Sequence, residues 1–175
     1  MIGVPRHKVL LVEHDEKWAE EFEKTKLTLV NIHGDNVVDI QHVGSTAIKG
    51  IMAKPILDIA IVFRSISDSV FKIMKDNGYE YFGEVVPGKH LFILRGEGEV
   101  SLQHIHCYEE KNLEHFFDQI KFRDFIRSHP EYAKEYEILK QELFKIYFND
   151  RKKYTEGKQA FFNKIKQLVD ENFIK

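Results

Sequence analysis

The sequence predicts an α+β domain: a small mixed β-sheet with helices packed on it and a helical C-terminal third. Three observations predict this class. A helical pattern near the N-terminus precedes two apolar strand-like runs, and alternating aromatic-rich segments fill the middle of the chain. From about residue 111 onward the apolar residues recur with a helical period of 3.6. This order does not fix how the strands pair.

The first half of the chain is expected to fold as a helix, two strands and a short helix. Trp18, Phe22 and Leu29 recur at near-helical spacing, Asp15 can cap this helix, and Gly34 follows as a C-terminal stop. The next two segments are rich in Val and Ile, as strands are. The expected elements are a helix over 16–33, strands over 36–43 and 55–63, and a short helix from Ser65 or Ser67 to residues 77–78.

The second half is expected to contain three further strands and then three helices. Gly96-Glu97-Gly98 is suited to the short loop of a hairpin, and Pro130 is suited to the first turn of the second of these helices. The expected strands cover 79–84, 90–95 and 99–108, and the apolar helical positions fall within 113–120, 132–146 and 161–169.

Length and composition favour one domain over residues 1–175. A chain of 175 residues buries about 70% of its surface, and 43% of these residues are hydrophobic. A net charge of −2 gives no overall field for nucleic acid or an anionic membrane. The single cysteine, Cys107, cannot form an intramolecular disulfide, and no signal-like or membrane-spanning apolar segment is present. We therefore expect a cytoplasmic protein without a membrane partner.

The most informative segment runs from His42 through Gly44-Ser45-Thr46 and on to Asp58. A strand that runs into Gly-Ser-Thr can turn tightly, and a following helical turn would offer N–H groups and two hydroxyls to an anion. Asp58 interrupts an apolar strand, and burying a carboxylate costs several kcal/mol unless a cation, donors or a cleft compensate it. This pattern is typical of phosphate chemistry.

A Gly-Ser pair followed about a dozen residues later by a strand Asp resembles the signature of the nucleotidyltransferase superfamily. The chain more closely resembles the GrpB (UPF0157-type) family in five segments, namely residues 12–18, 42–47, 53–59, 104–106 and 122–125. The resemblance implies that Gly44, Ser45 and Thr46 bind phosphate and that Asp58 is catalytic and holds a divalent metal, Mg²⁺ or Mn²⁺.

One position departs from the superfamily pattern. Nucleotidyltransferases usually carry a second carboxylate two residues after the first, and here that position is Ala60. Since strand side chains alternate, Asp58 and Ala60 share a face without a second acid. The usual two-metal site cannot be assembled from this strand. Either other ligands complete a one-metal site, or nucleotide binding is kept and transfer is lost.

His104 and His106 lie two apart on an expected strand, so their imidazoles share a face. With Asp58 they would form a set of two histidines and one carboxylate, which suits Zn²⁺, iron or Mn²⁺. The alternative is two hydrogen-bonded histidines at the end of a sheet. The metal hypothesis predicts that all three converge on a cleft lined by Arg123.

Three basic residues are candidates for phosphate contacts. The helical pattern turns Arg123 toward the sheet, where it could clamp a phosphate or pair internally with Asp124 or Asp58. Lys158 lies on an apolar stripe and either extends to solvent or meets an anion; it also matches a position in the resembling family. Lys54 could bind a ligand phosphate or pair with Asp58.

The resulting hypothesis is a nucleotidyltransferase-like protein that binds a nucleoside triphosphate or another phosphorylated small molecule together with a divalent metal. An attack by an acceptor hydroxyl or amine on the α-phosphorus, releasing pyrophosphate, is the reaction implied by the resemblance. Two alternatives stay open: an inert nucleotide-binding adaptor, which Ala60 favours, and a metal-dependent hydrolase built on Asp58, His104 and His106. Nucleic acid is not an expected partner, and the sequence does not predict an oligomeric state.

Overall fold

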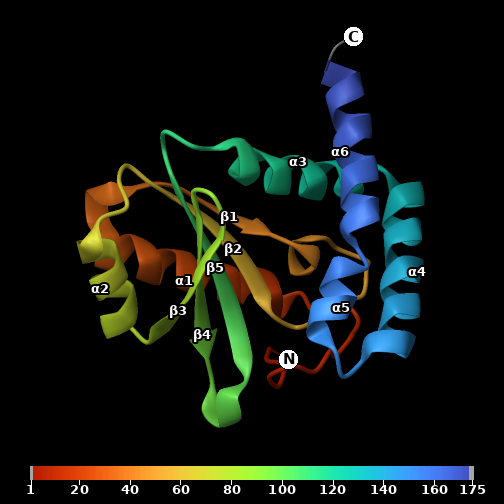
Figure 1. Ribbon diagram of the computed structural model, residues 1–175, viewed down its shortest axis with the longest axis horizontal. Coiled ribbons are helices and arrows are strands. Elements are labelled where there is room, and N and C mark those ends of the chain that lie inside the picture. The colour runs from red at the N-terminus through yellow and green to blue at the C-terminus, as the bar shows by residue number, and fades with distance from the viewer. Residues whose placement is uncertain (1, 174–175) are drawn as a thin grey trace.

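The computed structural model describes residues 2–173 and contains five strands and six α-helices (Figure 1). The α-helices are α1 (Lys17–His33), α2 (Asp68–Asp76), α3 (Glu114–Ser128), α4 (Pro130–Tyr147), α5 (Arg151–Glu156) and α6 (Gln159–Phe173). The strands are β1 (Val37–Val43), β2 (Leu57–Phe63), β3 (Tyr79–Val86), β4 (Lys89–Arg95) and β5 (Ser101–Glu109). The predicted α+β class with a helical C-terminal third is confirmed.

The five strands form one mixed sheet in the order β1-β2-β5-β4-β3. Only the central pair β2 and β5 is parallel, and the other neighbours are antiparallel. In this register Val43 of β1 lies beside Asp58 of β2, and Asp58 lies beside His104 of β5. The register therefore brings three distant parts of the sequence to one place on the sheet.

Helices cover both faces of the sheet (Figure 1). On one face α1 and α2 pack against the apolar side chains of the central strands, with Trp18 and Leu29 of α1 fully buried. On the other face Phe116 of α3 packs against Ala60 and Tyr108. The opposite side of α3 packs against α4 and α6 in a separate apolar cluster. As its pattern predicts, α3 lies between the sheet and the other C-terminal helices.

The helical third differs from the prediction in two respects. It contains four helices, because α5 and α6 are separated by a turn at Gly157, where a Cβ atom would overlap Leu143 of α4. The side chain of Asp150 caps α5 by accepting the Lys153 N–H at 3.1 Å. Phe117, which falls within the apolar helical positions expected over 113–120, is 48% exposed. No helix in residues 2–173 combines the length and apolar character needed to cross a membrane.

The predicted helix starts are close to the observed ones, but only one of the two predicted caps uses its side chain. Asp15 Oδ1 accepts the backbone N–H of Lys17 at 3.1 Å, just ahead of α1. Ser67 occupies the N-cap position of α2, yet its hydroxyl lies 2.8 Å from that of Ser69 and does not cap the backbone. The sequence therefore predicted where α2 starts, but not that the Ser67 hydroxyl would contact Ser69.

Candidate functional site

Gly44 follows β1 directly and lies against Asp58. Its φ of +70° belongs to the region that side chains disfavour, and a Cβ atom there would overlap the Asp58 carboxylate. Both constraints require glycine at this position. The Gly-Ser-Thr loop and the strand aspartate therefore lie together, as the sequence predicts.

The two hydroxyls of this loop contact the protein itself. Residues Ser45–Ala47 form a single 3₁₀ turn. The Ser45 hydroxyl donates to Tyr136 of α4 at 3.3 Å, and the buried Thr46 hydroxyl lies 2.9 Å from Nε2 of His42. Burial lowers the pKa of His42 to about 4, so this imidazole is neutral at pH 7. These contacts hold the loop, and phosphate binding by Gly44, Ser45 and Thr46 stays a prediction.

Asp58, His104 and His106 form one cluster. Because β2 and β5 are parallel and in register, Oδ1 of Asp58 lies 3.3 Å from Nδ1 of His104 and 3.5 Å from Nε2 of His106. The Asp58 side chain is 31% exposed, so it can be reached from solvent. Strand alternation predicted that the two histidines share a face, and the parallel register of β2 and β5 brings that face to Asp58.

The cluster keeps Asp58 charged and His106 neutral at pH 7. Burial raises the pKa of the Asp58 carboxyl, but hydrogen bonds and charge from His104 and His106 outweigh it and hold this pKa well below its usual range. Burial lowers the pKa of His106 to about 4, although Asp58 opposes the shift. Lys89, at the start of β4, adds a cation to this cluster. Burial lowers the pKa of Lys89, although the charge of Asp58 opposes this shift. Sequence reasoning did not identify Lys89 as part of this site.

The donor types in the cluster suit a transition metal, but their arrangement is that of a hydrogen-bonded group. Within residues 2–173, no group of three or more His, Cys, Asp or Glu side chains is arranged to hold a metal ion. Nδ1 of His106 is buried without a hydrogen-bond partner in the described part of the chain, whereas a metal-binding histidine usually has its second nitrogen bonded. Metal binding by Asp58, His104 and His106 therefore stays a prediction.

Two lysines share an aromatic neighbour, and the charge of Asp58 acts on one of them, Lys54. The Nζ atoms of Lys54 and Lys158 lie 5.5 and 5.1 Å from the centre of the Tyr154 ring. Lys158, at the turn between α5 and α6, is 9% exposed, and Lys54, just before β2, is half-buried. Burial and the charge of Lys158 lower the pKa of Lys54 to about 7, although Asp58 opposes this shift.

Within residues 2–173, neither lysine has an acidic partner within 4 Å. Among the described residues, no carboxylate oxygen lies within 4 Å of either ammonium, so the alternative of a Lys54–Asp58 ion pair is not what the structure contains. Lys54 also precedes β2, which begins at Leu57, so it lies outside the strand that carries Asp58. In the described part of the chain, the ammonium groups of both lysines contact aromatic rings instead of carboxylates.

A third buried lysine, Lys140 of α4, was missed by the sequence reasoning. It is 1% exposed, donates to the carbonyl oxygen of Met52 and lies 4.6 Å from the centre of the Tyr136 ring. Burial and the charge of Lys158 lower its pKa to about 7. Tyr136, Lys140 and Leu143 share one helical stripe, and this spacing could have identified the lysine.

Arg123 is buried, but its contacts are internal. Its Nε donates to Asp124 at 2.7 Å, and one terminal nitrogen donates to the carbonyl oxygen of His42 at 2.8 Å and to Gln41 at 3.1 Å. Of the alternatives, the structure contains the ion pair with Asp124 and not one with Asp58. Arg123 anchors α3 to the end of β1, and its predicted role as a phosphate clamp has no support from these contacts.

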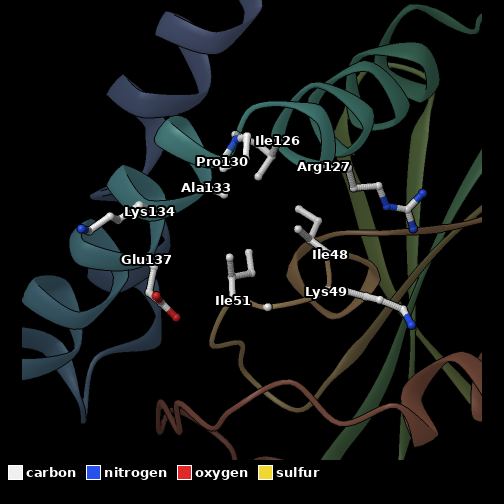
Figure 2. A pocket seen from close by; sticks show the side chains of 10 residues that line it. Ile48, Lys49, Ile51, Ile126, Arg127, Pro130, Ala133, Lys134 and Glu137 are labelled. Atoms are coloured by element: carbon white, nitrogen blue, oxygen red, sulfur yellow. The ribbon is translucent and has the colours of Figure 1, made fainter.

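Two pockets lie away from Asp58. One of about 270 Å³ lies between residues 48–51 and the junction of α3 and α4, where Ile48, Ile51 and Ile126 point into the space (Figure 2). Another of about 390 Å³ lies between α4 and the region of residues 157–164. Neither includes Asp58 or Arg123, so the prediction of a cleft lined by Arg123 matches neither pocket.

Comparison with known proteins identifies the family. Residues 8–168 match the family described as GrpB protein. The chain belongs to the GrpB family. This confirms the resemblance inferred from the five sequence segments.

Relatives support the same assignment. The chain is 40% identical over 171 residues to the glutamate-rich protein GrpB of Alkalihalophilus pseudofirmus, covering 94% of this chain and 98% of that protein. It is 36% identical over 161 residues to the UPF0157 protein YqkA of Bacillus subtilis, covering 90% of this chain and 46% of YqkA. The chain thus spans about half the length of YqkA.

A solved structure of a GrpB protein shares the fold of this chain. The crystal structure of GrpB from Enterococcus faecalis aligns with a TM-score of 0.85 and 28% identity, covering 95% of this chain and 100% of that one. A structure of the Cid1 poly(U) polymerase aligns with a TM-score of only 0.47 and 13% identity, covering 84% of this chain and 49% of that one. A similarity of that size carries no argument about the reaction.

Proposed function

We propose that this GrpB-family protein binds a nucleoside triphosphate or a similar phosphate ligand beside Asp58, with Lys54 and Lys158 as its phosphate contacts. The observation that carries this proposal is the pair of lysines on the Tyr154 ring. Taking an ammonium group out of water costs several kcal/mol unless an anion or a full set of acceptors compensates it. An anionic ligand is the partner that such a pair lacks.

The pair fits phosphate better than it fits a single carboxylate. An ammonium group is a compact charge with three donors, and two of them on one ring can contact separate oxygens of a phosphate chain. Because the pKa of Lys54 is lowered to about 7, it is only partly charged in the free protein at pH 7. A bound phosphate favours the charged form, so binding would take up protons at this site.

The charge of Asp58 makes a divalent cation part of this proposal. Asp58 is ionised at pH 7 and would repel a neighbouring phosphate. A cation held by Asp58, His104 and His106 would offset this repulsion and supply Lewis-acid chemistry when bound. Imidazole donors favour Mn²⁺ or Zn²⁺ over Mg²⁺, which prefers oxygen ligands. Of the expected cofactors, Mn²⁺ and Zn²⁺ are therefore the first to test.

Nucleotidyl transfer is the reaction that the family resemblance suggests, and ligand binding without transfer is the second candidate. The second candidate is favoured by Ala60, which is fully buried and lies between Gln41 of β1 and His106 of β5. None of these three side chains is an acid that could replace the missing carboxylate. A small phosphorylated ligand could then be sensed without being consumed.

Calorimetric titration of the full chain tests the proposal. Tripolyphosphate and the four ribonucleoside triphosphates would be titrated with and without Mn²⁺ or Zn²⁺, and pyrophosphate release would be followed in parallel. We expect Lys54→Met and Lys158→Met each to raise the Kd about tenfold or more, since each removes one charged contact. Lys152→Met, at a side chain that is 85% exposed, is the matched control and should bind like the wild type.

The outcomes separate the candidates. Absence of binding to tripolyphosphate and to every nucleotide, with or without metal, would overturn the proposal. Nucleotide binding with pyrophosphate release would support transfer. Nucleotide binding without release in the presence of hydroxyl and amine acceptors would support the second candidate.

A further inference from the structure

The segment between the Gly44 loop and β2 is held by α4 at the main chain of a single residue, Met52. Its N–H donates to Oε1 of Glu137 at 2.8 Å. Its carbonyl oxygen accepts from Nζ of Lys140. Residues three apart lie on the same face of a helix, so one turn of α4 binds both backbone polar groups of Met52.

Met52 lies two residues before Lys54, and the residue between them is also fixed. Ala53 exchanges two backbone hydrogen bonds with Val12, at 3.0 and 2.9 Å. The main chain is therefore held by α4 at Met52 and by the N-terminal segment at Ala53. The direction in which Lys54 leaves the main chain is set by these two contacts.

We propose that Glu137 is a positioning residue of the phosphate site: with Lys140 it holds the Met52 peptide and so keeps Lys54 over Tyr154, where it meets the ligand. This inference rests on the proposed function, because it concerns the affinity of that site. Figure 2 shows Glu137 on α4 and Ile51 on the facing segment, at the point where the two elements meet. Glu137 itself touches no part of the proposed ligand.

Positioning and electrostatics predict opposite effects when Glu137 is removed. The carboxylate is an anion near Lys140, and its charge opposes the lowering of the pKa of that lysine. If only its charge mattered, removing it would tighten the binding of an anionic ligand. If it positions Lys54, removing the acceptor loosens the segment and weakens binding.

The experiment measures the Kd of tripolyphosphate by calorimetry for the wild type and a series of variants, with a thermal melt of each. Glu137→Ala removes the acceptor and the charge, and we expect the Kd to rise about tenfold. Glu137→Gln keeps an oxygen that can accept the Met52 N–H, and its Kd should stay within about twofold of the wild type. Glu142→Ala, which removes the same charge from an exposed position of α4, is the matched control and should bind like the wild type.

Two further comparisons keep the test decisive. If Glu137→Ala does not fold, Glu137→Asp replaces it, because the shorter side chain keeps the charge and withdraws the acceptor. If the Kd of tripolyphosphate rises in Glu137→Asp and is unchanged in Glu137→Gln, the result supports the positioning role of Glu137. Binding by Glu137→Ala or Glu137→Asp that equals or exceeds that of the wild type overturns it. Loss of tripolyphosphate binding in the wild type itself would instead overturn the proposed function, and the two failures are therefore distinguishable.

Discussion

Raising the pH from 7 to 9 should stabilise the free protein through Lys54. The folded pKa of Lys54 is about 7 because of burial and the charge of Lys158, whereas the unfolded value is near that of a free lysine, about 10.4. Between these values the unfolded chain binds more protons than the folded one, so stability rises with pH. The gain is fully developed above the unfolded pKa and is lost as the pH falls through 7.

The size of this effect follows from the two pKa values. Between pH 7 and pH 9 a lysine with these values contributes about 2 kcal/mol to the free energy of unfolding. This is an upper bound for Lys54, because part of its side chain is exposed and solvent screens it. Lys54→Met removes the titrating group and keeps an apolar stem of similar length.

Urea denaturation of the wild type and Lys54→Met at pH 7 and pH 9 measures the effect. Groups that titrate in both proteins, such as Lys140 and Cys107, cancel in the comparison of the two pH dependences. We expect the wild type to gain up to about 2 kcal/mol relative to the variant over this range. With saturating tripolyphosphate the gain should disappear, because the bound anion keeps the ammonium charged.

A pH dependence that is the same in both proteins to within about 0.5 kcal/mol would refute this reasoning. It would mean that Lys54 keeps the pKa of a solvated lysine. The argument for an unpartnered, desolvated cation would then fail, and with it the main support for the phosphate site.

Two further predictions concern the loop and the carboxylate. Gly44→Ala should lower the free energy of unfolding by about 2 kcal/mol or more, because φ is +70° and the new methyl group meets Asp58; a urea melt that shifts by less than about 0.5 kcal/mol would contradict the observed packing. Asp58→Asn should change stability by no more than about 1 kcal/mol, since Asn keeps an acceptor for the histidines and no lysine or arginine in residues 2–173 lies within 4 Å of Asp58. A loss of about 3 to 5 kcal/mol in denaturant melts would instead show that Asp58 is half of a structural ion pair.

The sequence could predict those parts of the site that depend on residue type and strand parity. Gly44 was predictable because a tight turn after a strand requires glycine, and Asp58 because a carboxylate in an apolar strand needs compensation. The shared face of His104 and His106 follows from alternation along a strand. Parity does not say which strands pair, so their meeting with Asp58 depended on the family resemblance until the parallel register of β2 and β5 was known.

Strand parity and helical periodicity could not predict the hydrogen-bond partners of polar side chains. Thr46 was assigned to a ligand, yet its hydroxyl bonds His42, which the turn after β1 brings within 2.9 Å. The helical pattern turned Arg123 toward the sheet correctly, but it could not show that the carbonyl of His42 and the side chain of Gln41 would occupy its donors. Such contacts depend on which tertiary neighbours lie within hydrogen-bond distance, and a single sequence does not specify distances.

We distinguish structural from functional basic residues in this protein by the acceptors to which their N–H groups donate. The guanidinium of Arg123 donates to the carbonyl oxygen of His42, and that of Arg127 donates to the carbonyl oxygen of Ala47. These two carbonyls lie at the two ends of the Gly44 loop. The ammonium of Lys140 donates to the carbonyl oxygen of Met52, farther along the same segment. The helical third thus supplies cations that bind the main chain around the loop and hold it against the sheet.

Among the described residues, Lys54 and Lys158 donate no such hydrogen bond to the main chain. Both lie on the Tyr154 ring, and within the described residues neither has a carboxylate within 4 Å. The segment that carries Lys54 is held on both sides, so its ammonium is kept in place without being neutralised. A cation that the fold orients but does not neutralise can contribute its charge to a ligand, and the adjacent carboxylate of Asp58 then makes a phosphate bound with a divalent metal the ligand class to test first.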